Sequence, residues 1–135
     1  MARSRATGSV YISHSHEDNE LVRDLVRRLR EAKLQPFVDL TDISVGADWK
    51  QKVREQIRSA DAVLMLLTPA ILKSPWMMTE LGMAEGFERL IVPVTAGLKS
   101  RDLPAPLQTY QIAPFDQVDD AIRMLSERLT TAAND

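Results

Sequence analysis

The sequence predicts an α/β domain in which helices cover both faces of a five-stranded parallel β-sheet. Short β-type runs alternate along the chain with segments whose apolar residues recur at helical spacing, which is typical of a parallel sheet with right-handed crossovers. The run DAVLMLLT, residues 61–68, is apolar almost throughout, as expected for a central strand that is buried on both faces. The 135 residues suffice for one domain and are too few for two ordinary ones.

The first half of the chain contains two strand–helix units. Residues 9–14, SVYISH, form the first expected strand, and a helix follows from Glu17 onward, with Asp24 placed to pair with Arg28. Residues 35–40, QPFVDL, form the second strand, which the loop TDISVGA joins to a second helix. The apolar positions are Leu21, Val22, Leu25, Val26 and Leu29 in the first helix and Trp49, Val53, Ile57 and Ala60 in the second.

The apolar strand at residues 61–68 leads into a third helix at SPWMMTEL. Ser74 is its expected cap, and Pro75 occupies the first helical position, where its missing N–H is harmless. One stripe of this helix carries Trp76, Glu80, Met83, Ala84 and Phe87, so a carboxylate lies on an otherwise apolar face. Residues 90–95, LIVPVT, form a fourth strand, and its Pro93 predicts a place away from the centre of the sheet.

The last part of the chain is expected to contain a proline-rich loop at residues 98–107, a weak fifth strand at residues 110–113 and a final helix. The apolar positions of that helix are Val118, Ile122, Leu125 and Leu129. We expect about the first eight and the last five residues to be loose termini of one domain that spans residues 1–135, with no internal linker.

The composition excludes several classes of protein. A formal net charge of -2 gives no electrostatic reason to expect a nucleic-acid partner. The absence of cysteine excludes a disulfide scaffold, a zinc–thiolate site and a cysteine nucleophile. No apolar run approaches the roughly 18 residues of a membrane span, and the N-terminus lacks an apolar signal core. We therefore expect a soluble, cytoplasmic domain with no membrane partner.

The predicted topology places the functional site at three loops. Parallel α/β sheets bind ligands outside the carboxyl ends of their strands, near a switch in strand order. The loops concerned are SHSHED at 13–18, DLTDISVG at 39–46 and TPAILKSPW at 68–76. Glu80 lies about one helical turn beyond the third loop, so its side chain is expected to reach the same crevice.

Other chemistries fit the sequence less well. The five glycines form neither a GxGxxG turn nor a phosphate-binding loop. A phosphoacceptor receiver domain shares this architecture, but it needs an aspartate after its third strand and a lysine after its fifth, where this chain has Thr68 and Ala113. His14 and His16 beside two acidic residues are either part of a metal site or of a polar loop that caps the first helix. Without a second cluster of ligands, the sequence favours the loop and predicts no metal.

Three segments together resemble the Toll/interleukin-1 receptor (TIR) domain in its bacterial form. They are YISHSHED, FVDLTDISVG and LMLLTPAILKSPWMMTEL, and the resemblance runs from about Val10 to Val94, with the final helix also fitting. It implies a single flavodoxin-like domain. Receptor-type animal members typically carry Phe-Trp before the last helix, whereas Phe115 is followed here by Asp116. This departure weakens the expectation of an animal-style adaptor.

The resemblance implies cleavage of NAD⁺ by a catalytic glutamate, which Glu80 matches. Nicotinamide leaves, and ADP-ribose or a cyclic isomer forms; NAD⁺ is the substrate, and no cofactor is implied. Breaking this bond builds positive charge on the ribose, and a carboxylate can stabilise such an oxocarbenium-like transition state. Because nicotinamide departs as a neutral molecule, no general acid is needed. The alternative is that Glu80 is an ordinary surface residue or pairs with a lysine such as Lys73.

The other candidate substrate-binding residues come from the same loops. They are Ser13, His14, Ser15, Asp39, Ile43, Gly46, Trp49 and Trp76. Trp76 and Trp49 are either core residues or pocket walls. Asp39 either caps a turn after the second strand or binds substrate, since its family counterpart borders the nicotinamide end of the pocket. Ser13, His14 and Ser15 either donate hydrogen bonds to ribose and phosphate or bond only within their loop. Gly46 permits a tight turn beside the exposed apolar Ile43.

These expectations leave three functions open. In the first, the domain is an NAD⁺-consuming effector of antiphage defence or signalling, activated when copies assemble and the second loop of one completes the pocket of another, with a sensor domain in the same or a partner chain. In the second, it is a non-enzymatic interaction module. In the third, it resembles a nucleoside deoxyribosyltransferase, which also uses a glutamate on an N-glycosidic bond. The Glu80–Trp76 pattern favours the first.

Overall fold

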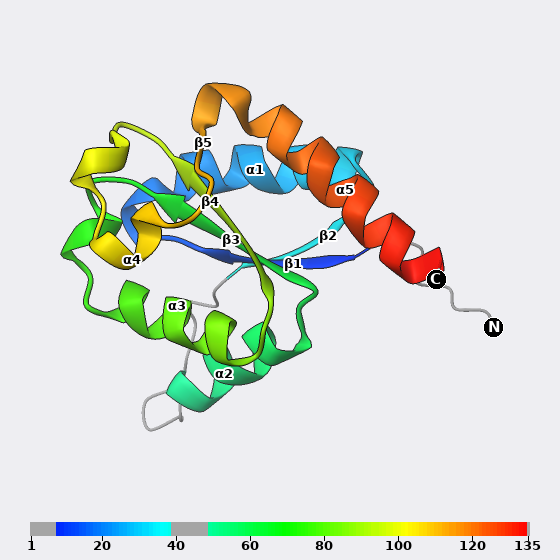
Figure 1. Ribbon diagram of the computed structural model, residues 1–135, viewed down its shortest axis with the longest axis horizontal. Coiled ribbons are helices and arrows are strands. Elements are labelled where there is room, and N and C mark those ends of the chain that lie inside the picture. Colours follow the sequence, from blue (N-terminus) through cyan, green and yellow to red (C-terminus); the bar gives the residue numbers. More distant parts are fainter. Residues whose placement is uncertain (1–7, 39–48, 135) are drawn as a thin grey trace.

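Five parallel strands form one sheet in the computed structural model, which describes residues 8–38 and 49–134 (Figure 1). The order of the strands is β2-β1-β3-β4-β5. Their bounds are Ser9–Ser13 for β1, Gln35–Val38 for β2, Ala62–Leu67 for β3, Leu90–Thr95 for β4 and Ala113–Pro114 for β5. The predicted five-stranded parallel sheet is therefore confirmed. The order reverses between β1 and β3, which is where such a sheet binds ligands.

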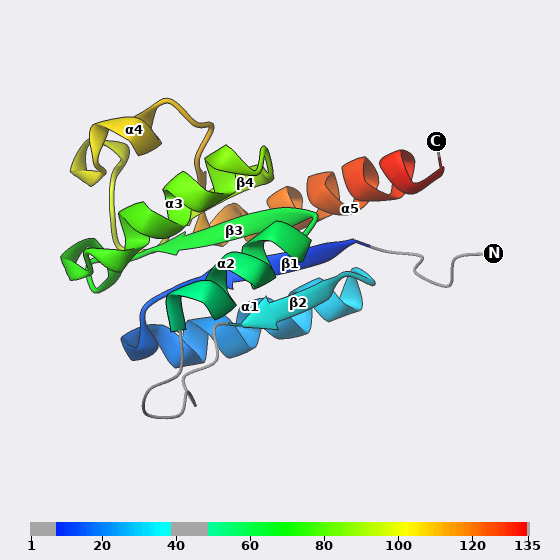
Figure 2. The same cartoon turned by 90° about the horizontal axis from the view of Figure 1, so that it is seen from below.

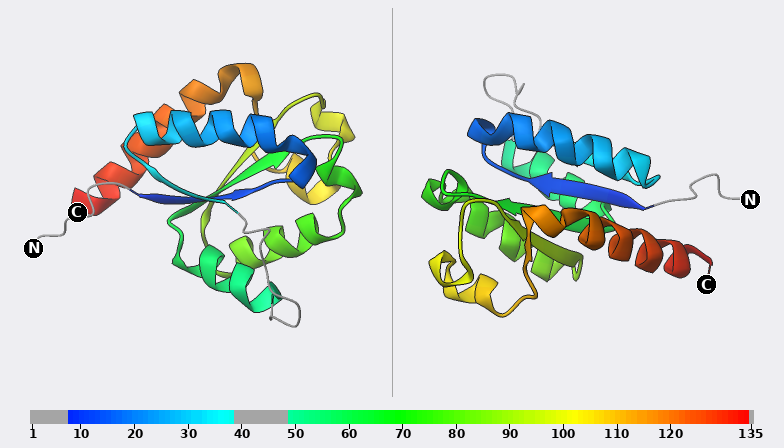
Figure 3. Two further views of the ribbon diagram at one scale, coloured as in Figure 1. Left: turned by 180° about the vertical axis from the view of Figure 1, so that it is seen from behind. Right: turned by 90° about the horizontal axis from the view of Figure 1, so that it is seen from above.

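Helices cover both faces of this sheet, as predicted. Figures 1 and 3 show α1 and α5 on one face and α2 and α3 on the other, and Figure 2 views the sheet from the α2 and α3 side. The helices span Asn19–Glu31 for α1, Trp49–Ser59 for α2, Trp76–Gly86 for α3, Ala105–Gln108 for the short α4 and Val118–Asn134 for α5. Within the described ranges, no helix is long and apolar enough to cross a membrane.

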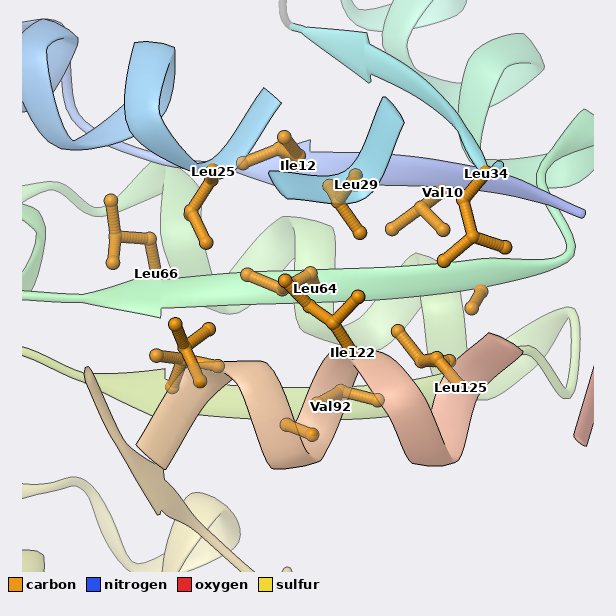
Figure 4. Close-up of a cluster of buried hydrophobic side chains, with 14 of the residues drawn as sticks. Val10, Ile12, Leu25, Leu29, Leu34, Leu64, Leu66, Val92, Ile122 and Leu125 are labelled. Carbon is orange, nitrogen blue, oxygen red and sulfur yellow. The ribbon is translucent and has the colours of Figure 1, made fainter. Parts of the chain in front are cut away.

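The alternation of side chains along the strands builds two separate cores. In β3, Ala62, Leu64 and Leu66 pack toward α1 and α5, whereas Val63, Met65 and Leu67 pack toward α2 and α3. Figure 4 shows the first core, in which side chains of α1 and α5 interdigitate with those of β1, β3 and β4. Because β3 is buried on both faces, it reads as the continuous apolar run seen in the sequence.

The last third of the chain differs most from the sequence-based expectation. Residues 98–107 are not simply a loop, because they contain the 3₁₀ turn Ser100–Asp102 and the start of α4. The fifth strand lies at Ala113–Pro114 rather than at residues 110–113. The helix α5 continues to Asn134, so helical backbone includes most of the stretch expected to be loose. The fourth strand matches residues 90–95, and its pairing with β5 begins at Val94, one residue after Pro93.

Ion pairs join the two helices on the α1 and α5 face. Asp24 Oδ2 accepts a hydrogen bond from Arg28 Nε at 3.2 Å, as the sequence predicts, and Arg28 Nη1 also donates to Asp119 of α5 at 2.7 Å. The Arg28 guanidinium, acting mainly through this hydrogen bond, holds the pKa of Asp24 below its usual value. The same guanidinium lies 5.8 Å from the centre of the Phe115 ring. Arg28 thus fixes α1 against the start of α5.

Candidate functional site

Glu80 is a buried carboxylate that two hydroxyl groups hold in place. Its side chain is 3% exposed. Tyr11 Oη donates a hydrogen bond to Glu80 Oε2 at 2.6 Å, and Ser13 Oγ donates to Oε1 at 2.7 Å. Burying a carboxylate without partners is costly, and hydrogen bonds to its charged form offset that cost. Both oxygens are therefore fixed in direction by β1.

The period of a β-strand explains why these two donors meet one acceptor. Tyr11 and Ser13 are two residues apart in β1, so their side chains point to the same face of the sheet, the face that α3 covers. The strand is held between two others, with Tyr11 opposite Phe37 of β2 and Val63 of β3. Because β1 is enclosed in the sheet, the positions of its hydroxyl groups are set by the backbone.

The start of α3 sets the place of Glu80 along the sheet. The helix begins at Trp76, one residue later than expected, and Ser74 Oγ accepts a hydrogen bond from the Trp76 backbone N–H at 3.2 Å. Pro75 is thus the N-cap rather than the first helical residue, and Ser74 before it supplies the hydrogen bond that the sequence predicted. The deeply buried positions are Met77, Glu80, Leu81 and Ala84, so Glu80 and Ala84 belong to both the predicted and the observed stripe, and Met77 and Leu81 were not predicted.

A polar hollow lies beside this carboxylate at the carboxyl ends of β1 and β3. Its volume is about 310 Å³. The residues that line it come from the loops after the two strands and the beginning of α3: His14, Ser15, His16, Glu17, Ala70, Lys73, Ser74 and Trp76. Among the described residues, Glu80 and Ser13 are not part of this lining. They lie next to it, because Ser13 precedes His14 and Glu80 is one helical turn after Trp76.

Hydrogen bonds tie the two loops around the hollow together. Thr68 Oγ1, just after β3, donates to Asp18 Oδ2 in the turn before α1, and the same oxygen accepts from the Ile71 N–H at 3.3 Å. His14 is 8% exposed, and its Nδ1 lies 3.3 Å from the carbonyl oxygen of Ile12. The two sides of the hollow are thus fixed relative to each other.

The structure brings together part of the predicted site. His14, Ser15 and Trp76 line the hollow, and Ser13 contacts Glu80 instead. Asp39, Ile43 and Gly46 lie outside the described residues, and of Trp49 the structure describes only that α2 begins there. In residues 8–38 and 49–134 no group of three or more His, Cys, Asp and Glu side chains is arranged to hold a metal ion.

Sequence reasoning missed Tyr11 because a tyrosine in a strand is usually a core residue. The available signal was its spacing of two from Ser13, which places both hydroxyl groups on one face. The alternative in which Lys73 pairs with Glu80 also differs from the structure, where both Glu80 oxygens accept from β1 and Lys73 lines the hollow.

A second tyrosine–glutamate pair joins α3 to the segment after α4, away from the hollow. Tyr110 Oη donates to Glu85 Oε2 at 2.6 Å, and both residues are at the surface or near it. Burial and this hydrogen bond raise the pKa of Tyr110 to about 12. The pair offers a natural control for the buried one.

A larger groove of about 680 Å³ lies elsewhere, between α1 and the edge strand β2. Its lining combines apolar residues with the ends of arginines, among them Val22, Val26, Arg23, Arg27 and Arg30. This groove lies away from the switch between β1 and β3, and Glu80 is not part of its described lining. The smaller hollow is therefore the better candidate site.

The chain is similar to one known protein family and to several curated proteins. The family model described as TIR domain matches residues 10–128. Human Toll/interleukin-1 receptor domain-containing adapter protein is 28% identical over 124 residues, which cover 87% of this chain and 56% of the adapter. The 2' cyclic ADP-D-ribose synthase BtTIR of Bacteroides thetaiotaomicron is 28% identical over 53% of this chain and 25% of the synthase. A probable synthase of the same kind from Brachypodium distachyon, BdTIR, is 26% identical over 72% and 44%.

Solved structures share the fold. A TIR-STING receptor of C. gigas superposes with a TM-score of 0.73 at 24% identity, covering 93% of this chain and 41% of that one. The TIR domain of the Toll-related receptor TRR-2 of Hydra magnipapillata gives 0.66 at 20% identity, covering 94% and 98%. The CMP N-glycosidase BcmB of Clostridium botulinum gives 0.63 at 16%, covering 90% and 99%. The chain thus spans between a quarter and just over half of the curated relatives it matches.

Proposed function

This chain belongs to the TIR domain family, and on that premise we propose that it cleaves the bond between nicotinamide and ribose in NAD⁺. Glu80 is the catalytic carboxylate, and nicotinamide and ADP-ribose or a cyclic isomer are the products. NAD⁺ is consumed as a substrate, and the reaction needs no further cofactor. The two relatives named as cyclic ADP-ribose synthases support this choice of substrate.

One observation carries the proposal, which is the place of Glu80 in the fold. A carboxylate with 3% exposure lies at the strand-order switch, beside a polar hollow, with both oxygens directed by hydroxyl donors. A buried charge at such a position stabilises neighbouring positive charge more strongly than one in water, because the surroundings screen it less. Ribosyl cleavage develops positive charge of this kind.

The reaction follows from these groups. As the C1′–N bond of NAD⁺ lengthens, its electron pair goes to the nicotinamide ring, which leaves neutral, and positive charge develops on C1′ and the ring oxygen of the ribose. Glu80 stabilises this charge, while Trp76 forms a wall of the pocket. Water then attacks C1′ and releases one proton, which gives ADP-ribose; attack by a hydroxyl group of the same molecule gives a cyclic product.

Replacement of the charge at Glu80 tests this assignment. The change Glu80→Gln keeps the size of the side chain and removes its charge, so we expect nicotinamide release to fall on the order of a hundredfold or more. Glu85→Gln is the matched control, because Glu85 lies on the same helix but is exposed. The measurement is chromatographic quantification of nicotinamide from concentrated protein, with circular dichroism to confirm folding. Near-normal turnover by folded Glu80→Gln would overturn the assignment.

A non-enzymatic interaction module is the second candidate. The human adapter matches 87% of this chain, more than either synthase. The two hydrogen bonds to Glu80 also fit a structural carboxylate. On this alternative the wild-type protein releases no nicotinamide at any concentration, and Glu80→Gln lowers only its thermal stability.

A third candidate is transfer or hydrolysis at a nucleoside, as in a deoxyribosyltransferase. The fold shared with the CMP N-glycosidase makes CMP a suitable second substrate for the same assay. Release of cytosine without release of nicotinamide would favour this candidate.

We also propose that activity depends on assembly of several copies in the cytoplasm, in antiphage defence or signalling. A sensor domain in the same or a partner chain would promote that assembly. This domain covers 25 to 56% of the matched relatives, so the rest of their length is available for such a domain. The contact that completes the pocket involves Ile43 and Gly46 of the second loop, both outside the described residues.

A further inference from the structure

Tyr11 carries a hydroxyl group that the packing of its core does not require. The residue is 0% exposed and belongs to a cluster of apolar side chains between the sheet and α2, α3 and α4. A phenylalanine would fill the same space without bringing a polar atom into this core. A buried hydroxyl group is costly unless it is hydrogen-bonded, and the bond to Glu80 Oε2 at 2.6 Å meets that cost.

The two donors to Glu80 lie at different distances from the hollow along β1. The strand β1 runs toward the hollow, so Ser13 is its last residue and His14 and Ser15 already line the hollow. Tyr11 is two residues further from that opening, about 6.6 Å along the strand. Ser13, which directly precedes the lining residue His14, holds Oε1, whereas Tyr11 holds Oε2.

We infer that Tyr11 is the positioning residue for Glu80, and that a substrate displaces Ser13 but not Tyr11. This inference rests on the proposed NAD⁺ cleavage and concerns the same site. The hydroxyl group of Tyr11 keeps Oε2 fixed during turnover, so that Oε1 points toward the hollow. A ribose hydroxyl group of the bound substrate replaces Ser13 as the donor to Oε1.

The two donors therefore affect different kinetic constants. Tyr11 does not touch the substrate, so loss of its hydroxyl group changes the orientation of Glu80 in the transition state and lowers kcat while KM is nearly unchanged. Ser13 competes with the substrate for Oε1, so its removal lowers KM. A residue that served only the stability of the core would change neither constant in the folded enzyme.

The test compares Tyr11→Phe, Ser13→Ala and Tyr110→Phe in steady-state release of nicotinamide from NAD⁺. We expect Tyr11→Phe to lower kcat about tenfold, the effect of losing a hydrogen bond to a charged group, with KM changed less than about threefold. Tyr110→Phe is the matched control, because it removes the same donor at the same distance from another glutamate of α3 and should leave both constants unchanged.

Each outcome decides the inference. A wild-type kcat for folded Tyr11→Phe overturns it, and so does an equal loss in Tyr110→Phe or a higher KM in Ser13→Ala. If Glu80→Gln abolishes nicotinamide release while Tyr11→Phe retains a normal kcat, the inference fails and the proposed function stands. If the wild type and all variants release no nicotinamide even when concentrated and crowded, both fail.

A stabilised background protects the test against unfolding of Tyr11→Phe. Gly82 is exposed on α3, and a Cβ atom there would meet nothing within 4 Å. Gly82→Ala should therefore stabilise the helix without reaching the site. The comparison of kcat is then made between Gly82→Ala and Gly82→Ala/Tyr11→Phe, at a temperature below the melting point of both.

Discussion

At the scale of single residues, the cost of burial explains the surroundings of Glu80. Moving a carboxylate out of water costs several kcal/mol after relaxation. In this chain two hydroxyl donors offset part of that cost, and neither carries a charge that would cancel the field of the carboxylate. An arginine or lysine partner would neutralise Glu80 and weaken its effect on a developing cation. Tyr11 and Ser13 are neutral donors, so these two hydrogen bonds hold the carboxylate without cancelling its charge.

Trp76 is the residue whose two expected roles can now be separated. It packs against the core beneath α3 and also lines the hollow. Trp76→Ala should raise KM for NAD⁺ by removing a wall of the pocket and should lower the melting temperature. Because the ring is only partly buried, we expect a loss of about 3 kcal/mol, the lower end for deletion of a large aromatic side chain. Kinetics and thermal melts on the same sample measure both.

Trp76→Phe separates the two effects. An aromatic ring of smaller size should restore most of the stability and part of the affinity. If Trp76→Ala loses stability yet keeps the wild-type KM, Trp76 is a core residue alone.

The sequence was informative about individual residues where their spacing fixed their position. Glu80 and Trp76 could be predicted as one group because they are four residues apart on a helix. The role of Ser13 as a donor to Glu80 could not, since it depends on how far the third helix lies along β1. Tyr11 was missed because a search for apolar positions treats tyrosine as a core residue and takes no account of its hydroxyl group.

At the scale of secondary-structure elements, α3 contains two glycines that its packing does not require. Gly82 and Gly86 are exposed, and a Cβ atom at either position would meet nothing within 4 Å. Glycine within a helix costs about 0.5–1 kcal/mol relative to alanine. Gly82→Ala should therefore raise the melting temperature by about 2–5 °C. Differential scanning calorimetry measures the change.

Gly97 provides the opposite control for this prediction. It has φ +78°, where an L side chain is strained, so Gly97→Ala should lower the melting temperature. A lower melting temperature in Gly82→Ala would contradict the prediction, because it would show that a Cβ atom at position 82 destabilises α3.

Periodicity predicts long elements well and short ones poorly, and this chain shows why. The helices α1 and α5 and the strands β3 and β4 have enough apolar positions to define a period. The strand β5 has two residues and pairs only with Val94 and Thr95, so it leaves almost no pattern. The helix α4 has four residues and starts among prolines, which by themselves indicate a loop.

At the scale of the whole molecule, strand order brings distant segments together. Residues 14–18 and 68–76 are at least fifty positions apart, yet they meet because β1 and β3 are neighbours and run in the same direction. This meeting could be predicted from the rule for parallel sheets without any side-chain information. The contribution of the second loop, residues 39–46, stays a prediction because Val38 is the last described residue before it.

Dependence of activity on protein concentration tests the proposed assembly. The sequence TDISVGA contains the apolar residues Ile43 and Val45, which we expect to be exposed, and a net charge of -2 causes little repulsion between copies. If a neighbour completes the pocket, NAD⁺ cleavage per molecule should rise with concentration or crowding. Ile43→Asp should abolish the rise by placing a charge in the contact. Ala105→Asp is the control, because it adds the same charge at the exposed start of α4, where an acidic residue is tolerated.

The assay follows nicotinamide over a wide dilution series, with light scattering on the same samples. Constant activity from a monodisperse monomer contradicts the assembly model and leaves the chemistry of Glu80 intact, since that chemistry is tested by Glu80→Gln alone.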